Sequence, residues 1–284
     1  MQIFVLGPTR VRRLDGAAVP VGGARLRALL TVLALRPGRT VPVAVLVDEV
    51  WDGDEPPADA VAALQALVGR LRRALGAAAV VSGPGGYRLA VAPDAVDLHR
   101  FDRLAADGAR SLEAGEPEKA LAVLDDALAL WRDPVLADLP GRTAEAARWE
   151  TRRRGAVRSR LAALLALGRP DEALPELAAL GDAFPLDEPL HALRIRALCA
   201  TGRPAEALAA YETVRRRLAT RLGTDPGPEL RALHTTLLTP APAATPPGAR
   251  APSPEPAPAP APASATTAPP PGTRGPSPEL APAP

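Results

Sequence analysis

The sequence predicts a mainly α-helical protein with a small β component, made of two folded domains and a tail. Short alternating apolar stretches, broken by turn residues, fill the first 21 positions and recur near position 80. Elsewhere leucines and alanines recur at the three- and four-residue spacing of helices. From Pro240 onward proline, alanine, serine and threonine dominate, a composition that cannot bury a core. The expected domains are residues 1–93, residues 94–239 and a disordered tail, residues 240–284.

The first domain is predicted to contain a strand meander, three helices and a C-terminal hairpin, in that order. Asp15-Gly16 is a strong hairpin turn, and Pro37-Gly38 ends the first helix. Thr40 and Pro42 are expected to open the second helix. This order is that of a winged helix-turn-helix, whose third helix enters the major groove of DNA while the hairpin reaches the neighbouring minor groove or backbone. The predicted elements are strands within 2–21, helices over 26–34, 42–51 and 57–75, and a hairpin over 80–91.

The helix predicted over residues 57–75 has one apolar face and one cationic end. Pro57 suits its first turn, and Gly76 suits its end. Steps of about 100° per residue place Arg73 nearly opposite the apolar face and Arg72 on its flank. Such a helix could pack by its leucines and present guanidinium groups to DNA. The alternative is an ordinary amphipathic helix with a solvated basic edge. The apolar face consists of Leu64, Leu67, Val68, Leu71 and Leu75.

The second domain contains an internal repeat of the form Gly-x-Pro-x-x-Ala-Leu. It begins at Gly115, Gly168 and Gly202, and the last two copies lie 34 residues apart, the period of tetratricopeptide helix pairs. The first interval is longer, so an insert around WRDPVLADLPGR is expected to lengthen a loop or a helix. Such helix pairs stack into an α-solenoid. Its role could be partner binding or dimerisation, and the sequence leaves both open.

Composition gives little direct indication of function. With 34 Lys and Arg against 32 Asp and Glu, the net charge is only +2, so nucleic-acid binding would require local clustering of charge. The one cysteine, Cys199, is expected to be a buried thiol, and the three histidines show no metal-ligand spacing. We expect no cofactor, no metal and no enzymatic activity, since no phosphate-binding loop or catalytic triad is recognisable. The lack of a signal peptide or a long apolar run predicts a cytoplasmic protein that does not bind membranes.

Charged and aromatic residues of the second domain are interpreted structurally. The charged cluster over residues 145–158 is expected to be a solvated helix face with pairs such as Glu150–Arg154. Trp131 and Trp149 are expected to be packing anchors.

Several stretches together resemble a known family. They are LVDEVWDGDEPPADAVAALQALVGRLRRALG, GPGGYRLAV, VDLHRFDRLAADGARSL, ALALWRDPVLADLP and TGRPAEALAAYETVRRRLATRLGTDPGPELRALH. In this order they are similar to SARP/AfsR-type transcriptional activators of actinobacteria. Those proteins join an OmpR-like winged helix, the output domain of two-component systems, to a bacterial transcriptional activator domain of tetratricopeptide-like helices. The resemblance covers about four-fifths of the chain.

The resemblance implies a sequence-specific activator of a biosynthetic, secondary-metabolite gene cluster. It implies a homodimer on direct repeats of double-stranded DNA, located at the nucleoid, and contact with the sigma or alpha subunit of RNA polymerase. The residues it assigns to DNA are Gln65, Arg70, Arg72, Arg73 and, in the wing Gly85–Arg88, Arg88; those it assigns to polymerase are Asp52, Asp54 and Glu55.

The outer face of the third helix departs from the polar mixture usual in such helices. Ala62, Ala66 and Gly69 cannot hydrogen-bond a base edge, so we expect phosphate contacts and DNA shape to dominate recognition. The same depletion favours an alternative function, a tetratricopeptide interaction scaffold or sensor whose winged helix no longer binds DNA. A gel shift with promoter DNA would separate the two functions.

Overall fold

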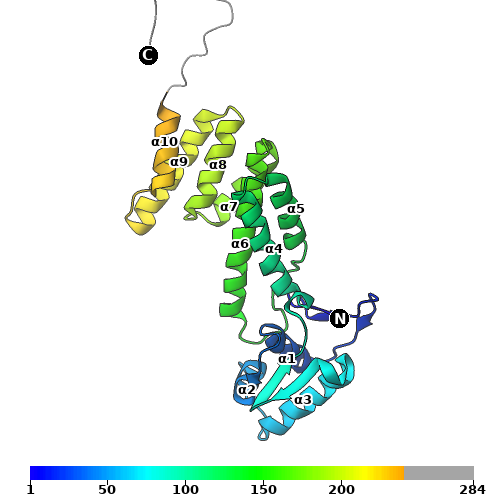
Figure 1. Ribbon diagram of the computed structural model, residues 1–284. Coiled ribbons are helices and arrows are strands. Elements are labelled where there is room, and N and C mark those ends of the chain that lie inside the picture. The colour runs from blue at the N-terminus through cyan, green and yellow to red at the C-terminus, as the bar shows by residue number, and fades with distance from the viewer. Residues whose placement is uncertain (240–284) are drawn as a thin grey trace, which may run out of the picture. The chain divides into compact units, whose positions relative to one another are not determined.

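The computed structural model describes residues 1–239, and the predicted tail lies outside the described residues. The chain begins with an antiparallel sheet in the order β1-β2-β3. Its dark blue strands lie beside the N-terminus in Figure 1. Val11 in the middle strand lies opposite Ile3 and Val19, and all three side chains are buried, whereas Arg10 and Arg12 are exposed. This alternation confirms the predicted meander. The strands are β1 (Gln2–Phe4), β2 (Arg10–Arg12) and β3 (Ala18–Val19).

Three helices and a second sheet complete a winged helix, which confirms the predicted order of elements. The second sheet has the order β4-β6-β5. One detail of the prediction was wrong, because Pro42 precedes the second helix and belongs to β4, where its extended backbone pairs with Gly86 of the hairpin. The elements are α1 (Ala24–Ala34), β4 (Val41–Pro42), α2 (Val43–Trp51), α3 (Ala60–Leu75), β5 (Val80–Gly83) and β6 (Gly86–Leu89).

Residues 97–238 form an array of helices, each packed on the next through α9, with α10 packed on α8 and α9. The repeated Gly-x-Pro ends one helix and begins the following one at Pro117, Pro170 and Pro204, as predicted. No helix within residues 1–239 is both long and apolar enough to cross a bilayer. The helices are α4 (Asp97–Glu113), α5 (Pro117–Leu128), α6 (Thr143–Ala166), α7 (Pro170–Ala183), α8 (Glu188–Ala200), α9 (Pro204–Leu222) and α10 (Pro228–Leu238).

The insert between α5 and α6 forms a loop, residues 129–142, that packs against the winged helix. Trp131 lies edge-on to Phe101 of α4, with ring centroids 5.1 Å apart. Leu136 is fully buried in the apolar cluster that also contains Ile3 of β1 and Trp149 of α6. The two tryptophans are therefore packing anchors, as predicted. One hydrophobic core extends across the winged helix and the first helices of the array.

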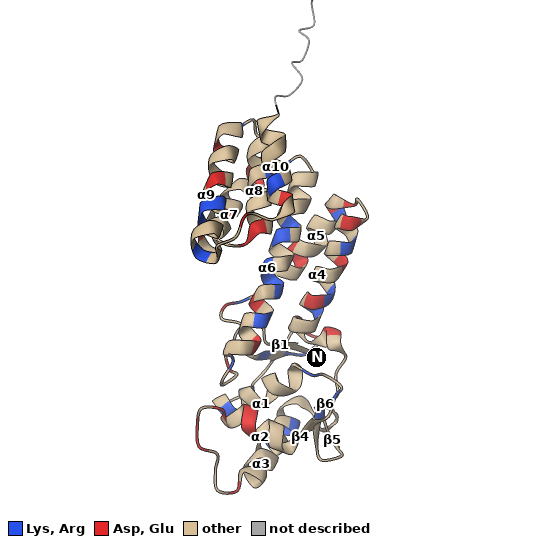
Figure 2. Ribbon diagram, turned by 90° about the vertical axis from the view of Figure 1, so that its left-hand side faces the viewer, with Lys and Arg blue, Asp and Glu red and all other residues tan. Residues whose placement is uncertain are grey.

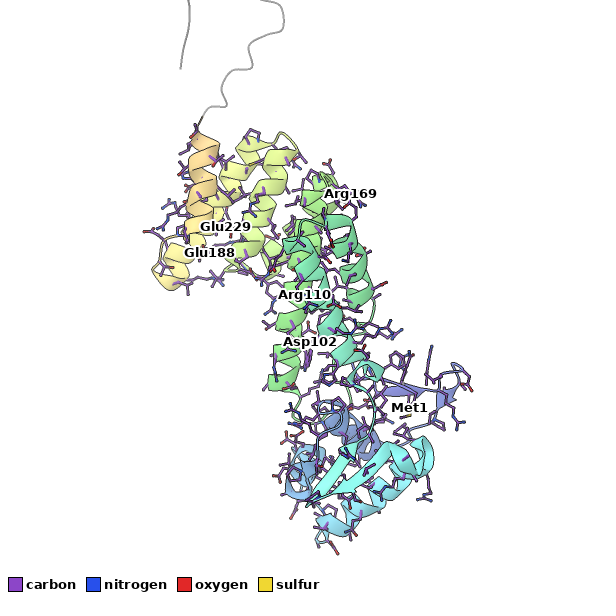
Figure 3. The ribbon with its side chains drawn as sticks, in the orientation of Figure 1. Met1, Asp102, Arg110, Arg169, Glu188 and Glu229 are labelled. Carbon is purple, nitrogen blue, oxygen red and sulfur yellow. The ribbon has the colours of Figure 1, made fainter. Side chains whose placement is uncertain are left out.

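The arginines of α6 are not a simple solvated face, which corrects the sequence interpretation. Blue segments recur along α6 in Figure 2, and Figure 3 labels Asp102 on α4, the partner of one of these arginines. The predicted Glu150–Arg154 pair does not form: Glu150 lies 3.9 Å from Arg153, and Arg154 lies over the Phe184 ring. These ion pairs connect α6 to its neighbours, namely Arg152–Asp102, Arg153–Asp133, Arg158–Asp187 and Arg160–Asp125.

Cys199 is exposed, so the prediction of a buried thiol was wrong. The buried face of α8 includes Ile195 and Leu198. Cys199 follows exposed Arg196 by three residues and therefore lies on the same, exposed side of the helix. The apolar run around Cys199 therefore did not indicate which side of the helix it occupies.

Candidate nucleic-acid interface

Helix α3 is fixed by its cap and its apolar face. Asp59 accepts a hydrogen bond from the backbone N–H of Ala62 at 2.9 Å, so the helix begins at Ala60 and not, as predicted, at Pro57. Gly76 ends the helix with φ of 100°, a conformation that favours glycine. The predicted apolar face is buried against α1, α2 and β5. Its fully or nearly fully buried members are Leu64, Leu67, Val68 and Leu71.

The opposite face of α3 is open. In Figures 1 and 2 the helix lies on the side of the winged helix away from α4 and α6. Within residues 1–239 the one hydrogen bond of the Arg73 guanidinium is to the carbonyl of Gly69 on its own helix, at 3.5 Å. Arg70 donates to the carbonyl of Gly22 at 3.2 Å. Neither guanidinium forms an ion pair with any residue in positions 1–239. The exposed side chains of α3 are Val61, Ala62, Gln65, Ala66, Arg70 and Arg73.

Arg72 lies differently from the other predicted contacts. Its Nε donates to the carbonyl of Val80 at 2.8 Å, and its Nη2 donates to Ser82 Oγ at 2.9 Å, both in β5. The guanidinium also lies over the Tyr87 ring of β6, 5.8 Å from its centroid. These three contacts fix the hairpin to α3, so Arg72 is half-buried between them. Its structural role is to position the wing.

The hairpin predicted over residues 80–91 is present, and a two-residue connection joins its strands. Gly83 pairs with Gly86, and Pro84 and Gly85 form the turn. A Cβ at Gly86 would lie 2.0 Å from the carbonyl oxygen of Val41, so only glycine allows β4 to approach this closely. Arg88 lies opposite Val81, and its side chain is exposed. The wing therefore presents one exposed cation, on the face of the hairpin opposite to that of Tyr87.

The acidic loop between α2 and α3 is only partly free. Asp54 forms an ion pair with Arg25 of α1. The carboxylate of Asp52 occupies the space that a side chain at Gly141 would need. Asp52 therefore contacts the loop between α5 and α6, which contains Gly141. Glu55 is exposed and forms no ion pair within residues 1–239. Of the three predicted polymerase contacts, Asp52 and Glu55 form no ion pair within the described residues, whereas Asp54 does.

A buried carboxylate connects the end of β1 to the helical array. Asp97, the first residue of α4, accepts hydrogen bonds from the backbone N–H groups of Val5 and Leu6, at 2.8 and 3.1 Å. Burial raises the pKa of Asp97 to about 6, although these hydrogen bonds oppose the rise. The carbonyls of the same two residues accept hydrogen bonds from the insert. The backbone N–H of Arg132 donates to Leu6 at 2.7 Å, and that of Leu136 donates to Val5 at 2.9 Å.

A second carboxylate of the insert strengthens this junction. Asp138 accepts from the backbone N–H of Thr9 at 2.7 Å and from Arg27 Nε of α1 at 2.7 Å. Burial alone would raise the pKa of Asp138, but the hydrogen bonds from Arg27 and Thr9 outweigh it and lower the pKa. The winged helix is thus attached to the array by a hydrogen-bonded network as well as by apolar packing.

Comparison with known proteins agrees with this arrangement. Two family models match, one described as the C-terminal domain of transcriptional regulatory proteins over residues 22–89, the other as the bacterial transcriptional activator domain over residues 96–238. The regulatory protein DnrI of Streptomyces peucetius is 37% identical over 266 residues, which cover 89% of this chain and 97% of DnrI. The chain belongs to the SARP family of transcriptional activators. This confirms the resemblance found in the sequence.

Other SARP relatives are longer than the matched region. The regulatory protein AfsR of Streptomyces coelicolor is 40% identical over 249 residues, 86% of this chain but 25% of AfsR, so the chain spans about a quarter of that protein. A solved structure of Mycobacterium tuberculosis EmbR, in complex with a low-affinity phosphopeptide, matches with a TM-score of 0.77 and 34% identity. That match covers 84% of this chain and 64% of the EmbR chain.

In this SARP chain, the sequence did not indicate the residues that form hydrogen bonds with partners far away in the sequence. Asp97 and its partners Val5 and Leu6 lie more than 90 residues apart. The pairing of Arg72 with the hairpin was missed because a helical wheel shows only the flank on which a residue lies. The one available indication was the insert WRDPVLADLPGR, which interrupts the repeat and contains Asp138.

Proposed function

We propose that this chain is a sequence-specific DNA-binding transcriptional activator. Helix α3 enters the major groove, and the β5–β6 hairpin contacts the adjacent minor groove or backbone. The observation that carries the proposal is the open face of α3, where Arg70 and Arg73 are free of ion pairs beside a wing that carries Arg88. Membership of the SARP family supports the same conclusion.

In this proposal the DNA contacts come from Gln65, Arg70, Arg73 and Arg88, whereas Arg72 positions the wing. Most of the affinity comes from guanidinium–phosphate contacts and is therefore salt-dependent. Direct readout of bases is weak because the exposed face is rich in alanine. DNA shape supplies the remaining specificity.

The partners proposed are direct repeats at a promoter, a second copy of the chain on DNA, and RNA polymerase. The acidic loop, in which Asp52, Asp54 and Glu55 are all exposed, would meet the sigma or alpha subunit. The regulated genes would form a biosynthetic, secondary-metabolite cluster, and the protein would act at the nucleoid in the cytoplasm. In this organisation residues 1–93 bind DNA and residues 94–239 form the activator domain.

A salt-titrated binding assay with Arg73→Ala tests the proposal. Loss of one phosphate contact should weaken binding to every sequence and reduce the slope of log K against log salt by roughly one. Arg231→Ala is the matched control, since Arg231 is exposed on α10, far along the chain from α3. It should leave affinity and slope unchanged. An unchanged slope for Arg73→Ala would remove Arg73 from the DNA contacts.

The same assay tests how the sequence is recognised. With shape and phosphates dominant, single-base swaps in a half-site should change affinity only slightly. If each single-base swap instead lowered the affinity several-fold, direct readout of the bases would be strong. The scaffold alternative is favoured by the small side chains Ala62 and Ala66 on α3. It predicts that wild-type protein gives no shift with the upstream region of its own gene cluster at any salt concentration.

A further inference from the structure

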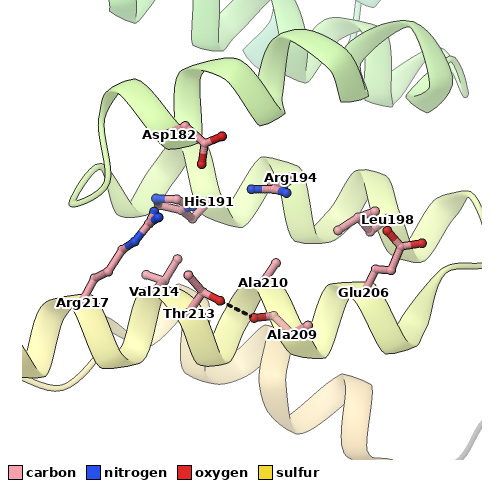
Figure 4. A pocket seen from close by; sticks show the side chains of 10 residues that line it. All are labelled: Asp182, His191, Arg194, Leu198, Glu206, Ala209, Ala210, Thr213, Val214 and Arg217. Carbon is pink, nitrogen blue, oxygen red and sulfur yellow. Dashed lines mark hydrogen bonds between the residues drawn. The ribbon is translucent and has the colours of Figure 1, made fainter.

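A cavity of about 300 Å³ lies between α7, α8 and α9, remote in sequence from the winged helix (Figure 4). Its walls carry Asp182 from α7, His191 and Arg194 from α8, and Glu206 and Arg217 from α9. Leu198, Ala210 and Val214 supply an apolar part of the lining. This volume is at the lower end of the range for sites that take small molecules.

His191 is the unusual residue in this cavity. Its side chain is 2% exposed, and its Nε2 is buried without a hydrogen-bond partner within residues 1–239. Burial lowers the pKa of His191, and the nearby Arg217 and Arg194 lower it further, although the Pro185 backbone opposes this. A buried polar atom without a partner is costly, so such atoms call for an explanation. A bound molecule would supply the missing partner.

Two arginines of the cavity also lack ionic partners. Neither Arg194 nor Arg217 forms an ion pair with any described residue, and Arg217 makes one long contact, 3.5 Å, with the carbonyl of Gly181. Other arginines nearby are paired, for example Arg196 with Glu229 at 2.8 Å. Figure 4 shows the Arg217 side chain extending toward His191, with Arg194 on the other side of the histidine. Two half-buried guanidinium groups therefore share one cavity.

The acidic residues of the cavity do not neutralise these arginines. Glu206 is engaged by Arg203, which donates to both of its oxygens at 2.6 Å. Asp182 is exposed and is the one carboxylate of the lining that no described cation pairs with. Two unpaired guanidinium groups against one unpaired carboxylate leave the cavity cationic. Its complement is an anion.

Backbone and hydroxyl groups further define the space. Gly181 of α7 is buried, and a Cβ there would lie 3.2 Å from His191 and 3.6 Å from Arg194 Nη1. A glycine inside a helix lowers stability by about 1 kcal/mol relative to alanine. The protein therefore loses some stability by keeping open the space at Gly181, beside His191 and Arg194. The Thr213 hydroxyl donates its proton to the carbonyl of Ala209, so it offers the cavity an acceptor and no donor (Figure 4). The donors toward the cavity are therefore the two arginines.

We propose that this cavity binds a small organic anion, a carboxylate or a phosphate ester with a short apolar body. Arg194 and Arg217 donate hydrogen bonds to the anionic group, and His191 takes up a proton on binding so that its Nε2–H donates to the same group. The apolar body lies on Leu198, Ala210 and Val214. The site is separate from the proposed DNA contacts, and the test below does not depend on DNA binding.

The test is an NMR titration of the full chain with butyrate, with butyl phosphate and with butanol, at constant ionic strength. The signal followed is the imidazole Hε1 of His191, which His191→Gln identifies among the three histidines. Butyrate or butyl phosphate should shift this signal in a saturable way and leave those of His99 and His234 in place. The anion that binds more tightly identifies the preferred headgroup. Butanol has the apolar body without the charge and should not bind.

Variants assign the binding to the two arginines. Arg194→Gln and Arg217→Gln should each weaken binding of the anion at least tenfold. Arg216→Gln is the matched control, because Arg216 is exposed on α9 next to Arg217 and does not line this cavity. Gly181→Ala keeps both arginines and should also weaken binding by narrowing the site. The proposal is overturned if neither anion shifts His191 saturably, if butanol binds as tightly, or if Arg216→Gln loses as much affinity as Arg217→Gln.

Discussion

The buried carboxylate of Asp97 predicts an unusual pH dependence of stability. Its pKa is about 6 in the folded protein against an ordinary value of 3.8, a difference equivalent to about 3 kcal/mol. The folded state therefore binds the proton more tightly than the unfolded chain. The contribution of Asp97 to stability is greatest at pH values below 3.8, falls as the pH rises through 4 to 6, and is constant above that range. About 2 kcal/mol of the change falls between pH 4 and pH 7.

Asp97→Asn isolates this effect, since asparagine does not ionise in this range. The free energy of unfolding should be measured by urea denaturation, followed by helical circular dichroism, at unit intervals from pH 4 to pH 7. The wild-type value minus the Asp97→Asn value should fall by about 2 kcal/mol over this range, whatever the cost of asparagine itself. Asp94→Asn is the control, because a hydrogen bond from Arg103 lowers the pKa of exposed Asp94, so the corresponding difference should rise with pH. A difference for Asp97 that is constant, or that rises with pH, would refute the reasoning.

Three substitutions test other parts of the structure. Gly7→Ala would place a Cβ 2.6 Å from the carbonyl oxygen of Arg132, and it should lower the free energy of unfolding by about 1–3 kcal/mol in urea denaturation. Arg72→Met keeps the aliphatic stem but loses two hydrogen bonds, so amide exchange in the β5–β6 hairpin should accelerate about tenfold while exchange in α8 stays unchanged. Asp138→Ala leaves Arg27 and the Thr9 N–H without their acceptor and should cost roughly 2 kcal/mol; a melting temperature equal to wild type would contradict the assigned role.

The order of elements could be predicted because local chemistry specifies it. The Gly-x-Pro repeats mark helix ends, since glycine suits the end of one helix and proline the start of the next. The hairpin was predictable because Pro84 and Gly85 favour a turn between two short apolar runs. The start of α3 was placed three residues early because Pro57 and Asp59 are both good start residues, and only the hydrogen bond to Ala62 distinguishes them.

The candidate site was less predictable because its details depend on partners distant in sequence. Arg70, Arg72 and Arg73 look alike in the sequence, yet Arg72 alone is engaged by β5. Asp54 and Glu55 are neighbours in one acidic loop, but only Asp54 meets an arginine of α1. Side-chain spacing predicts which face of an element a residue occupies. It does not predict which other element covers that face.

The network around Asp97 has a practical consequence for dissecting this protein. A fragment cut after residue 93, as the domain pattern of the sequence suggests, would lose the acceptor of the Val5 and Leu6 N–H groups. It would also lose Leu136 and Phe101, which belong to the same buried apolar core as Ile3. Such a fragment would expose apolar surface and aggregate during purification, whereas a fragment extended through the end of α6 at Ala166 would retain every one of these contacts. The smallest expressible DNA-binding unit is therefore larger than its winged helix.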